Sequence, residues 1–418
     1  MSETGTNGQI HNEIQTPCYI IHREELNRGI EELKQALAQH WPRAIVGYSF
    51  KTNALPWAML QMKQAGFYAE VVSEDEYDLA AKLGFEHVIY NGPVKGKRSF
   101  GDALRRGYIV NLDARRELDW LEEYADTDIT VGLRVNFDVE SECPGETSGG
   151  QEGSRFGFSY ETGEFAEALE RLKRMNIRLA GLHMHCGSRT RSINIYRALA
   201  RKACELKKEF DLNPGYIDLG GGYFGGMPNK PHFADYVKAI REELSPAYSP
   251  EDTTLIMEPG TSIITPPIEY VVSVVDVKKT YAGQFAVTDG SRIDVDPLHR
   301  KSSYFYEVQP ERTSSPGQSP AASSEQEQTA PQERKTIAKQ TVCGFTCMED
   351  DRLFDMIDQP ELRVGDRIAF KKSGGYTMCL TPLFIRYFPR VYVEEAGTYR
   401  IVRDAWGPDE YMSGSHLV

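Results

Sequence analysis

The chain lacks two features that define large classes of proteins, which are a surplus of basic charge and a long apolar run. Its 48 Lys and Arg residues stand against 61 Asp and Glu residues, so its formal net charge is −13. This negative charge opposes a broad electrostatic grip on nucleic acid or on anionic lipid. No run of about eighteen apolar residues occurs, and the first stretch, MSETGTNGQIHNEIQ, has neither a basic start nor an apolar core. We therefore expect a cytoplasmic protein that binds neither nucleic acid nor membrane.

Regular cysteine spacing is also missing. The seven cysteines stand at positions 18, 143, 186, 204, 343, 347 and 379 and form no CxxC pair. An odd, scattered set fits a reducing compartment better than a disulfide framework or a structural zinc site. Any important cysteine is therefore expected to act as a free thiol.

Eight short apolar runs alternate with amphipathic stretches, and this pattern predicts a (β/α)8 barrel. Most of the intervening stretches repeat apolar residues every three or four positions, as helices do. Alternating strands and helices imply a parallel sheet, and eight units in about 220 residues is the size of a closed barrel. An open, doubly wound sheet is the alternative. The predicted strands are residues 44–50, 67–73, 87–92, 108–112, 129–136, 178–186, 216–222 and 253–260.

The barrel is predicted to cover residues 23–265, between an N-terminal segment, 1–22, and a mainly β domain, 266–418. Runs such as IEYVVSVVDVKK and QFAVTDG in the last part are rich in β-forming residues. The strand-like stretch at the end of the N-terminal segment is expected to join that β domain. Residues 308–338 are rich in Ser, Pro, Gln and Glu and predict a flexible insertion, with a regulatory or docking segment as the alternative.

Polar and glycine residues gather at the predicted C-terminal ends of the barrel strands, where barrel enzymes carry their sites. Three consecutive glycines let backbone N–H groups approach an anion such as phosphate, although a tight turn without a ligand is the alternative. The chain has neither GxxxxGK[ST] nor an opening GxGxxG, so a small phosphorylated cofactor fits better than a nucleotide. The strand-end residues are Lys51, Arg134, His183, His185, Gly220, Gly221, Gly222, Glu258 and Gly260.

Lys51 is a candidate nucleophile, because burial in the barrel mouth would lower its pKa and free its amine for a Schiff base. A lysine at a strand end can equally lie at the surface. His183 and His185 share a strand face, but no carboxylate cluster accompanies them in the sequence, so we expect no metal and instead one histidine stacked on a flat cofactor. Glu258 could pair with a ring nitrogen. A lysine, a stacking ring, a phosphate cradle and an acid are what pyridoxal 5′-phosphate requires.

The motifs FKTN, VVSEDEYDLAAKLGF, SRFGF, HMHCGS, DLGGGY and EPG follow one another in this order. With them the chain resembles the fold-type III pyridoxal-phosphate decarboxylases, the diaminopimelate, ornithine and arginine decarboxylase group, and most of all the diaminopimelate decarboxylase-like proteins. The resemblance implies that Lys51 forms an aldimine with the cofactor, that His185 stacks on its ring and that Glu258 pairs with the ring nitrogen. It assigns the other cofactor contacts to Ser188, Gly220, Gly221, Gly222, Gly260 and Tyr376. We also expect Thr261, which follows Gly260, to contact the cofactor.

The β domain carries two further motifs of this group. CMEDD at 347–351 resembles its cysteine motif, and GGYTM at 374–378 resembles its tyrosine motif. The resemblance implies that Cys347 protonates the carbanion left by decarboxylation, at a site shared between the two subunits of a homodimer. Thiols have a reference pKa of ~8.5 and are mostly protonated at neutral pH, as such an acid must be.

Two positions depart from the pattern of the group. Met348 stands where members commonly carry an acid, and Thr261 stands where many carry an arginine. Asp351 and Glu349 are predicted to contact the substrate instead, and the alternative is that this acidic stretch is only a solvated loop.

The predicted function is decarboxylation of an α-amino acid with a polar distal group. An amino-acid racemase of the same fold type is an alternative, and it would not need Cys347. A non-catalytic homologue that acts as a regulator and a metal-dependent barrel hydrolase are two more. Lys51, His185, Glu258 and Cys347 together favour the decarboxylase.

Overall fold

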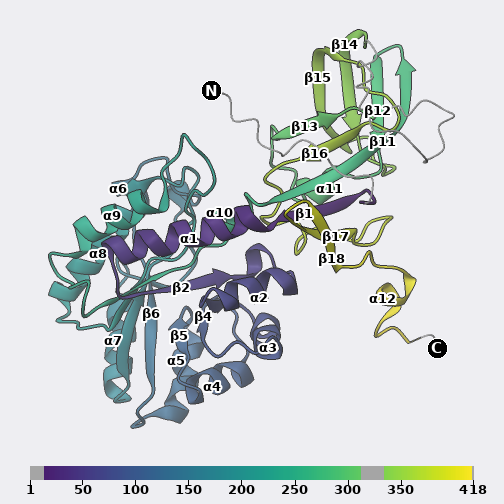
Figure 1. Ribbon diagram of the computed structural model, residues 1–418. Coiled ribbons are helices and arrows are strands. Elements are labelled where there is room, and N and C mark those ends of the chain that lie inside the picture. Colours follow the sequence, from purple (N-terminus) through teal and green to yellow (C-terminus); the bar gives the residue numbers. More distant parts are fainter. Residues whose placement is uncertain (1–13, 312–333, 417–418) are drawn as a thin grey trace. The chain divides into compact units, whose positions relative to one another are not determined.

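The computed structural model describes residues 14–311 and 334–416, which fold into two compact units (Figure 1). The barrel unit comprises Glu24–Pro267 and Gly374–Cys379. The β unit comprises the described parts of Met1–Arg23, Ile268–Ser373 and Leu380–Val418. Within the described ranges, no helix is both long enough and apolar enough to cross a membrane.

Eight parallel strands close into a barrel, which confirms the predicted fold and excludes the open sheet. The strands pair in the order β5-β4-β3-β2-β10-β9-β8-β6, and β5 also pairs with β6, which closes the ring. Each strand lies inside one of the eight apolar runs of the sequence. The strands are β2 (Ala44–Ser49), β3 (Tyr68–Val71), β4 (Val88–Tyr90), β5 (Ile109–Leu112), β6 (Thr130–Asn136), β8 (Arg178–His183), β9 (Tyr216–Asp218) and β10 (Thr254–Met257).

The helices between these strands are amphipathic. In α7, for example, Phe165, Ala168 and Leu172 recur at helical spacing and are buried. The α-helices of this unit are α1 (Arg23–His40), α2 (Pro56–Gln64), α3 (Glu74–Lys82), α4 (Lys97–Arg105), α5 (Arg115–Leu121), α6 (Val139–Glu142), α7 (Glu164–Arg174), α8 (Ile193–Glu209), α9 (Phe233–Leu244) and α10 (Thr261–Ile264). Shorter elements are β7 (Phe158–Ser159) and the 3-10 turns η1 (Phe50–Thr52), η2 (Glu122–Tyr124) and η3 (Gly150–Glu152).

The β unit is built on one mainly antiparallel sheet whose main path runs β15-β14-β12-β11-β1-β17-β18. The first strand, β1, pairs antiparallel with β11 and parallel with β17. Its side chains Cys18 and Ile20 pack with Val271, Ala369 and Tyr392 in a buried cluster. The elements are β1 (Cys18–His22), β11 (Ile268–Thr280), β12 (Gly283–Thr288), α11 (Arg292–Val295), β13 (Tyr306–Gln309), β14 (Thr336–Cys343), β15 (Arg352–Pro360), β16 (Arg367–Phe370), β17 (Arg390–Glu395), β18 (Thr398–Arg403) and α12 (Pro408–Met412).

The predicted insertion, 308–338, overlaps regular structure at both ends. β13 extends to Gln309, and β14 begins at Thr336 and pairs with β12 and β15. Pairing to neighbouring strands orders these polar ends, which composition alone does not indicate. The central part of the predicted insertion, 312–333, lies outside the described residues.

Candidate active site

Lys51 lies in η1, directly after β2, at the C-terminal mouth of the barrel. Its Nζ donates a hydrogen bond to Glu70 Oε2 at 2.9 Å, and Ser49 Oγ donates to the same oxygen at 2.5 Å. The side chain of Glu70 is 1% exposed, whereas that of Lys51 is 38% exposed. The amine is therefore anchored on a buried carboxylate while remaining open to the barrel mouth.

The lowered pKa that we expected for Lys51 is wrong. Burial does lower the pKa of this ammonium, but the carboxylates of Glu70 and Glu258 outweigh it and raise the pKa to about 12. Burial alone would raise the pKa of Glu70, yet Lys51 and the Ser49 hydroxyl hold that pKa below its ordinary value. Lys51 is thus an ammonium in this structure, and it must lose a proton before its amine can attack a carbonyl carbon.

A network of buried polar side chains forms the floor beneath Lys51. Asn91 Nδ2 donates to Glu258 Oε1 at 2.5 Å and to Glu70 Oε1 at 3.1 Å. Asn111 Nδ2 donates to Asn91 Oδ1 at 2.8 Å and to Asp218 Oδ2 at 3.3 Å. Burial, with the nearby carboxylates of Asp218 and Glu70, raises the pKa of Glu258 well above its ordinary value, and burial raises the pKa of Asp218 to about 7. A cationic donor, such as a protonated ring nitrogen, would favour the ionised form of these carboxyl groups and so lower their pKa.

His183 lies 2% exposed at the end of β8, beside this floor. Its Nε2 is 3.8 Å from Glu258 Oε2, and neither ring nitrogen has a hydrogen-bond partner among the residues that the structure covers. Our expectation that no carboxylates accompany the histidines is wrong, because β9 and β10 bring Asp218 and Glu258 to within 4.8 Å of His183. Ligands of one zinc ion lie about 3.4 Å apart, so this group is wider than a formed zinc site. His185 is not part of it.

His185 presents a neutral ring in a fixed orientation. Its Nδ1 accepts a hydrogen bond from Gly221 N at 3.1 Å, and Arg134 Nη2 donates to its carbonyl oxygen at 3.3 Å. Burial, together with the positive charges of Arg134 and Lys51, lowers the pKa of His185 to about 3. A Cβ at Gly220, where φ is +66°, would lie 2.3 Å from His185 Nδ1, so only glycine fits there. An uncharged, oriented imidazole is suited to stacking on a flat ring.

The glycine run does not leave all its N–H groups free for an anion. Gly220 N donates to Asp218 Oδ1 at 2.9 Å, and Gly221 N is used by the imidazole described above. The phosphate contacts of these two glycines therefore stay a prediction without support from the geometry. Gly222 has φ of +101°, and a Cβ at Gly260 would lie 2.1 Å from Thr52 Oγ1. These two positions require glycine because of backbone conformation and close approach.

The remaining predicted cofactor residues lie on loops at the same end of the barrel. Ser188 Oγ accepts hydrogen bonds from Thr190 N at 3.2 Å and Arg191 N at 2.6 Å, which shapes the turn before α8. Thr261 begins the short helix α10 directly after Gly260. Their contacts with phosphate stay predictions.

The segment Gly374–Cys379 belongs to the barrel unit, although it lies far outside the predicted barrel range. Asn53 Nδ2 donates to Gly374 O at 2.9 Å, and Tyr376 N donates to Thr52 O at 2.8 Å. Tyr376 has φ of +56°, a strained conformation that is enriched at functional sites. The structure thus brings Tyr376 beside the turn that carries Lys51.

Cys347 and Glu349 are exposed on the loop between β14 and β15 of the β unit. The side chain of Glu349 is fully exposed, with Arg352 Nη2 at 3.7 Å from its Oε2. Asp351, at the end of the same loop, is only 3% exposed. The two predicted substrate residues therefore differ sharply in their access to a ligand.

The carboxylate of Asp351 is occupied within the β unit. Its Oδ1 accepts hydrogen bonds from Ser291 Oγ at 3.0 Å and Arg292 N at 2.9 Å. Its Oδ2 accepts from Thr346 N at 3.1 Å and Thr346 Oγ1 at 2.6 Å. This geometry favours a structural role, holding the loop of Cys347, over the predicted substrate contact.

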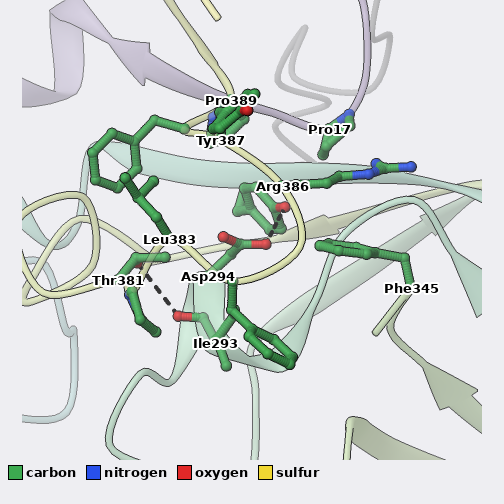
Figure 2. Close-up of a pocket in the computed structure, with 13 residues that line it drawn as sticks. Pro17, Ile293, Asp294, Phe345, Thr381, Leu383, Arg386, Tyr387 and Pro389 are labelled. Carbon is green, nitrogen blue, oxygen red and sulfur yellow. Dashed lines mark hydrogen bonds between the residues drawn. The ribbon is translucent and has the colours of Figure 1, made fainter. Parts of the chain in front are cut away.

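Two cavities differ in what they can hold. One in the β unit, of about 20 Å³, is lined by Asp294, Phe345 and Arg386 among others (Figure 2). It has room for about one water molecule and is too small for a substrate. The other, of about 590 Å³, lies in the barrel unit between the loop after β6 and the end of β8, where it is lined by Arg134 and His185 among others. Its volume is in the range of small-molecule sites.

Sequence reasoning missed the polar floor of the barrel. Glu70, Asn91, Asn111 and Asp218 each lie in or next to a buried strand, within the runs FYAEVVS, VIYNG, YIVNL and YIDLG. These residues could have been found in the sequence, because each is a polar residue within a run of apolar strand residues. A polar residue at such a position must find a hydrogen-bond partner in the barrel interior.

These residues fit pyridoxal phosphate. An amine stands open at the mouth, a neutral imidazole lies beside it, and buried acids short of positive charge form the floor. These are the aldehyde-binding, ring-stacking and ring-nitrogen positions that the cofactor needs.

Comparison with known proteins agrees with this geometry. Residues 23–265 match the pyridoxal-binding domain of the pyridoxal-dependent decarboxylases, and residues 263–374 match their C-terminal sheet domain. The chain is 27% identical over 414 residues to a probable chloroplastic diaminopimelate decarboxylase of Oryza sativa, covering 95% of this chain and 79% of that protein. It is 26% identical over 414 residues to diaminopimelate decarboxylase of Aquifex aeolicus, covering 93% and 89%.

The solved structure of diaminopimelate decarboxylase from M. jannaschii has the same fold. It superposes with a TM-score of 0.81 at 20% identity and covers 97% of this chain and 93% of that one. The family match confirms the predicted family and cofactor and favours a decarboxylase over the racemase and hydrolase alternatives. The chain belongs to the pyridoxal-dependent decarboxylase family and is an amino-acid decarboxylase that uses pyridoxal 5′-phosphate.

Proposed function

We propose that this enzyme removes the α-carboxylate of an amino acid with a polar distal group, as diaminopimelate decarboxylases do. The relatives above carry that name, and solved diaminopimelate decarboxylases hold L-lysine. A lysine/ornithine decarboxylase from Vibrio vulnificus, with the same fold at a TM-score of 0.68, holds cadaverine. L-lysine and cadaverine share a terminal amino group at the end of an aliphatic chain. The observation that carries the proposal is the pairing of Lys51 with Glu70 above a floor of buried acids.

Each barrel residue has a distinct role in this proposal. Bound pyridoxal phosphate supplies a carbonyl carbon that bonds to amines and a ring that accepts electrons. Lys51 holds the cofactor through its amine, and Glu70 fixes the position of that amine. His185 would offer its neutral ring as a stacking surface, and the Glu258 carboxylate would hold the ring nitrogen and keep that nitrogen protonated.

Cys347 is proposed as the acid that completes the reaction. Breaking the bond between Cα and the carboxylate releases carbon dioxide and leaves an electron pair on Cα. The Cys347 thiol gives its proton to Cα, which yields the amine product, and the resulting thiolate regains a proton from water. The exposure of Cys347 on its loop supports access to a substrate.

A homodimer with shared active sites, in the cytoplasm, completes the proposal. The β unit exposes a group of large apolar side chains, and exposed apolar surface of this kind commonly marks an interface. The ring centroids of Tyr387 and Tyr411 lie 5.2 Å apart, and those of Phe388 and Trp406 lie 4.8 Å apart. These contacts join the two chain segments that form the surface. The exposed residues are Leu380, Leu383, Phe384, Ile385, Tyr387, Trp406, Tyr411 and Met412.

Substrate recognition is proposed to use Glu349 and the barrel cavity beside His185. The side chain of Glu349 is fully exposed and can meet a distal ammonium. The cavity of about 590 Å³ can hold an amino acid together with its distal group. Asp351 stays a predicted substrate contact, although its four hydrogen bonds favour a role in holding the loop of Cys347.

Measuring carbon dioxide released from a panel of amino acids tests the proposed function. The panel should contain diaminopimelate, lysine, ornithine and arginine, with Lys51→Ala as the control. Borohydride reduction of the cofactor-loaded enzyme followed by peptide mapping should place the pyridoxyl group on Lys51. Release from none of these substrates, or an adduct on another lysine, would contradict the proposal.

A further inference from the structure

Asn91, at the end of β4, lies between the two acids of the site and contacts both. Its Nδ2 lies 3.1 Å from Glu70 Oε1 and 2.5 Å from Glu258 Oε1. Glu70 is the partner of Lys51, and Glu258 is the proposed partner of the ring nitrogen. The Asn91 amide therefore connects Glu70, the partner of the cofactor lysine, to Glu258, the proposed partner of the cofactor ring.

The orientation of this amide is determined by its surroundings. An asparagine NH2 group has two N–H bonds, one for each carboxylate, and its carbonyl oxygen can only accept. That oxygen accepts from Asn111 Nδ2 at 2.8 Å, and Asn111 Oδ1 accepts in turn from Tyr216 OH at 2.7 Å. Turning the amide over would aim its oxygen at two carboxylates and its N–H groups at a donor. The chain of contacts thus fixes both N–H bonds on the acids.

The surrounding packing leaves little freedom for the two acids to move. Asn91, Glu70 and Glu258 are 3%, 1% and 4% exposed. A Cβ at Gly47, on the strand between them, would lie 3.3 Å from Glu70 Cβ and 3.8 Å from Glu258 Cγ. The acids are close-packed against β2, and Asn91 bridges their carboxylate ends.

From this arrangement we infer that Asn91 is a positioning residue that holds Glu70 and Glu258 together as one unit beneath the cofactor. The inference rests on the proposed function, because it assigns these acids to Lys51 and to the ring nitrogen. Asn91 itself touches neither the substrate nor the reacting atoms in this scheme. Its N–H bonds favour the ionised form of both carboxylates and fix their oxygens in place.

A double-substitution cycle tests whether Asn91 acts through Glu258. The dissociation constant of pyridoxal phosphate is measured by absorbance for the wild type, Asn91→Leu, Glu258→Gln and the double variant. Asn91→Leu removes the two N–H donors that favour the ionised form of these acids, the form that a cationic ring nitrogen requires, so the constant should rise roughly tenfold to a hundredfold. In the Glu258→Gln background the same substitution should raise the constant several-fold less, because the carboxylate that Asn91 helps to ionise is already gone.

A second cycle pairs Asn91→Leu with Glu70→Gln and follows the rate at which cofactor-free protein captures pyridoxal phosphate. Coupling in both cycles supports the bridge. Additive effects in either cycle overturn it, because a merely structural asparagine would act independently of the acids. Asn91→Asp keeps the shape and, when ionised, offers no N–H, so it replaces Asn91→Leu if that variant does not fold. Asn213→Leu, at an exposed loop position, is the control and should change neither measurement.

The outcome separates this inference from the proposed function. A wild type that binds no pyridoxal phosphate or releases no carbon dioxide overturns the proposed function. A wild type that does both, while Asn91→Leu and Asn91→Asp bind the cofactor as tightly, overturns the bridge alone.

Discussion

Asp351→Asn is expected to destabilise the loop that carries Cys347 rather than to remove a substrate contact. Its two carboxylate oxygens accept four hydrogen bonds, from Ser291 Oγ, Arg292 N, Thr346 N and Thr346 Oγ1. A Cβ at Gly344 would lie 2.2 Å from Asp351 Oδ2, so the loop closes tightly around the carboxylate. The substitution changes one atom and leaves the shape almost unaltered.

The expected loss of stability follows from the number of hydrogen-bond donors that an asparagine at this position can satisfy. An asparagine offers one acceptor oxygen and one NH2 group where the aspartate offered two oxygens. Whichever way it turns, its NH2 group faces one hydroxyl, which can rotate and accept, and one backbone N–H, which cannot. One buried N–H therefore loses its acceptor, at a cost of ~1–3 kcal/mol, and the remaining bonds lose their charge assistance. We expect the free energy of unfolding of the β unit to fall by about 2–4 kcal/mol.

Denaturant unfolding and hydrogen exchange of the peptide around residues 344–352 measure this effect. Exchange should become faster in that peptide while peptides from the barrel stay unchanged. Asp350→Asn is the matched control, because Asp350 is exposed in the same loop and its substitution should change stability by less than about 0.5 kcal/mol. Unchanged unfolding and exchange, combined with a KM for the best diamino substrate that rises roughly tenfold, would refute the structural role and restore the substrate contact.

Three further predictions concern the cofactor lysine, the subunits and the insertion. Glu70→Gln removes an acid that helps to raise the pKa of Lys51 to about 12, so the cofactor-free variant should capture pyridoxal phosphate faster than the wild type near neutral pH. The difference between the two rates should shrink as the pH rises towards 12. Equal rates at neutral pH in stopped-flow absorbance would contradict this prediction. Mixing inactive Lys51→Ala and Cys347→Ala chains should restore part of the activity if subunits share their sites, and exchanged but inactive mixtures would exclude sharing. Replacing 312–333 with a short Gly/Ser linker should leave the Tm and cofactor content unchanged, because its sequence has no large apolar side chains, whereas extending the deletion to 338 cuts into β14 and should lower the Tm.

Local sequence patterns were enough to predict the barrel and the residues at its mouth. Apolar spacing is a local property, so eight runs of the right length identified the eight strands. The ends of parallel strands meet at one edge, so Lys51, His185 and Glu258 could be grouped without coordinates. Their chemistry, with the order of the motifs, then identified the cofactor.

The charge states of these groups, and which of them are free to bind a ligand, depend on contacts that form only in the folded chain. The pKa of Lys51 depends on Glu70, which lies on the neighbouring strand, and on the depth at which both are buried. Asp351 stands in an acidic run that looks solvated, yet folding buries it among donors from two loops. The segment Gly374–Cys379 joins the barrel through contacts more than three hundred residues away in sequence. Burial and long-range proximity arise when distant segments pack, and no local pattern of residues records them.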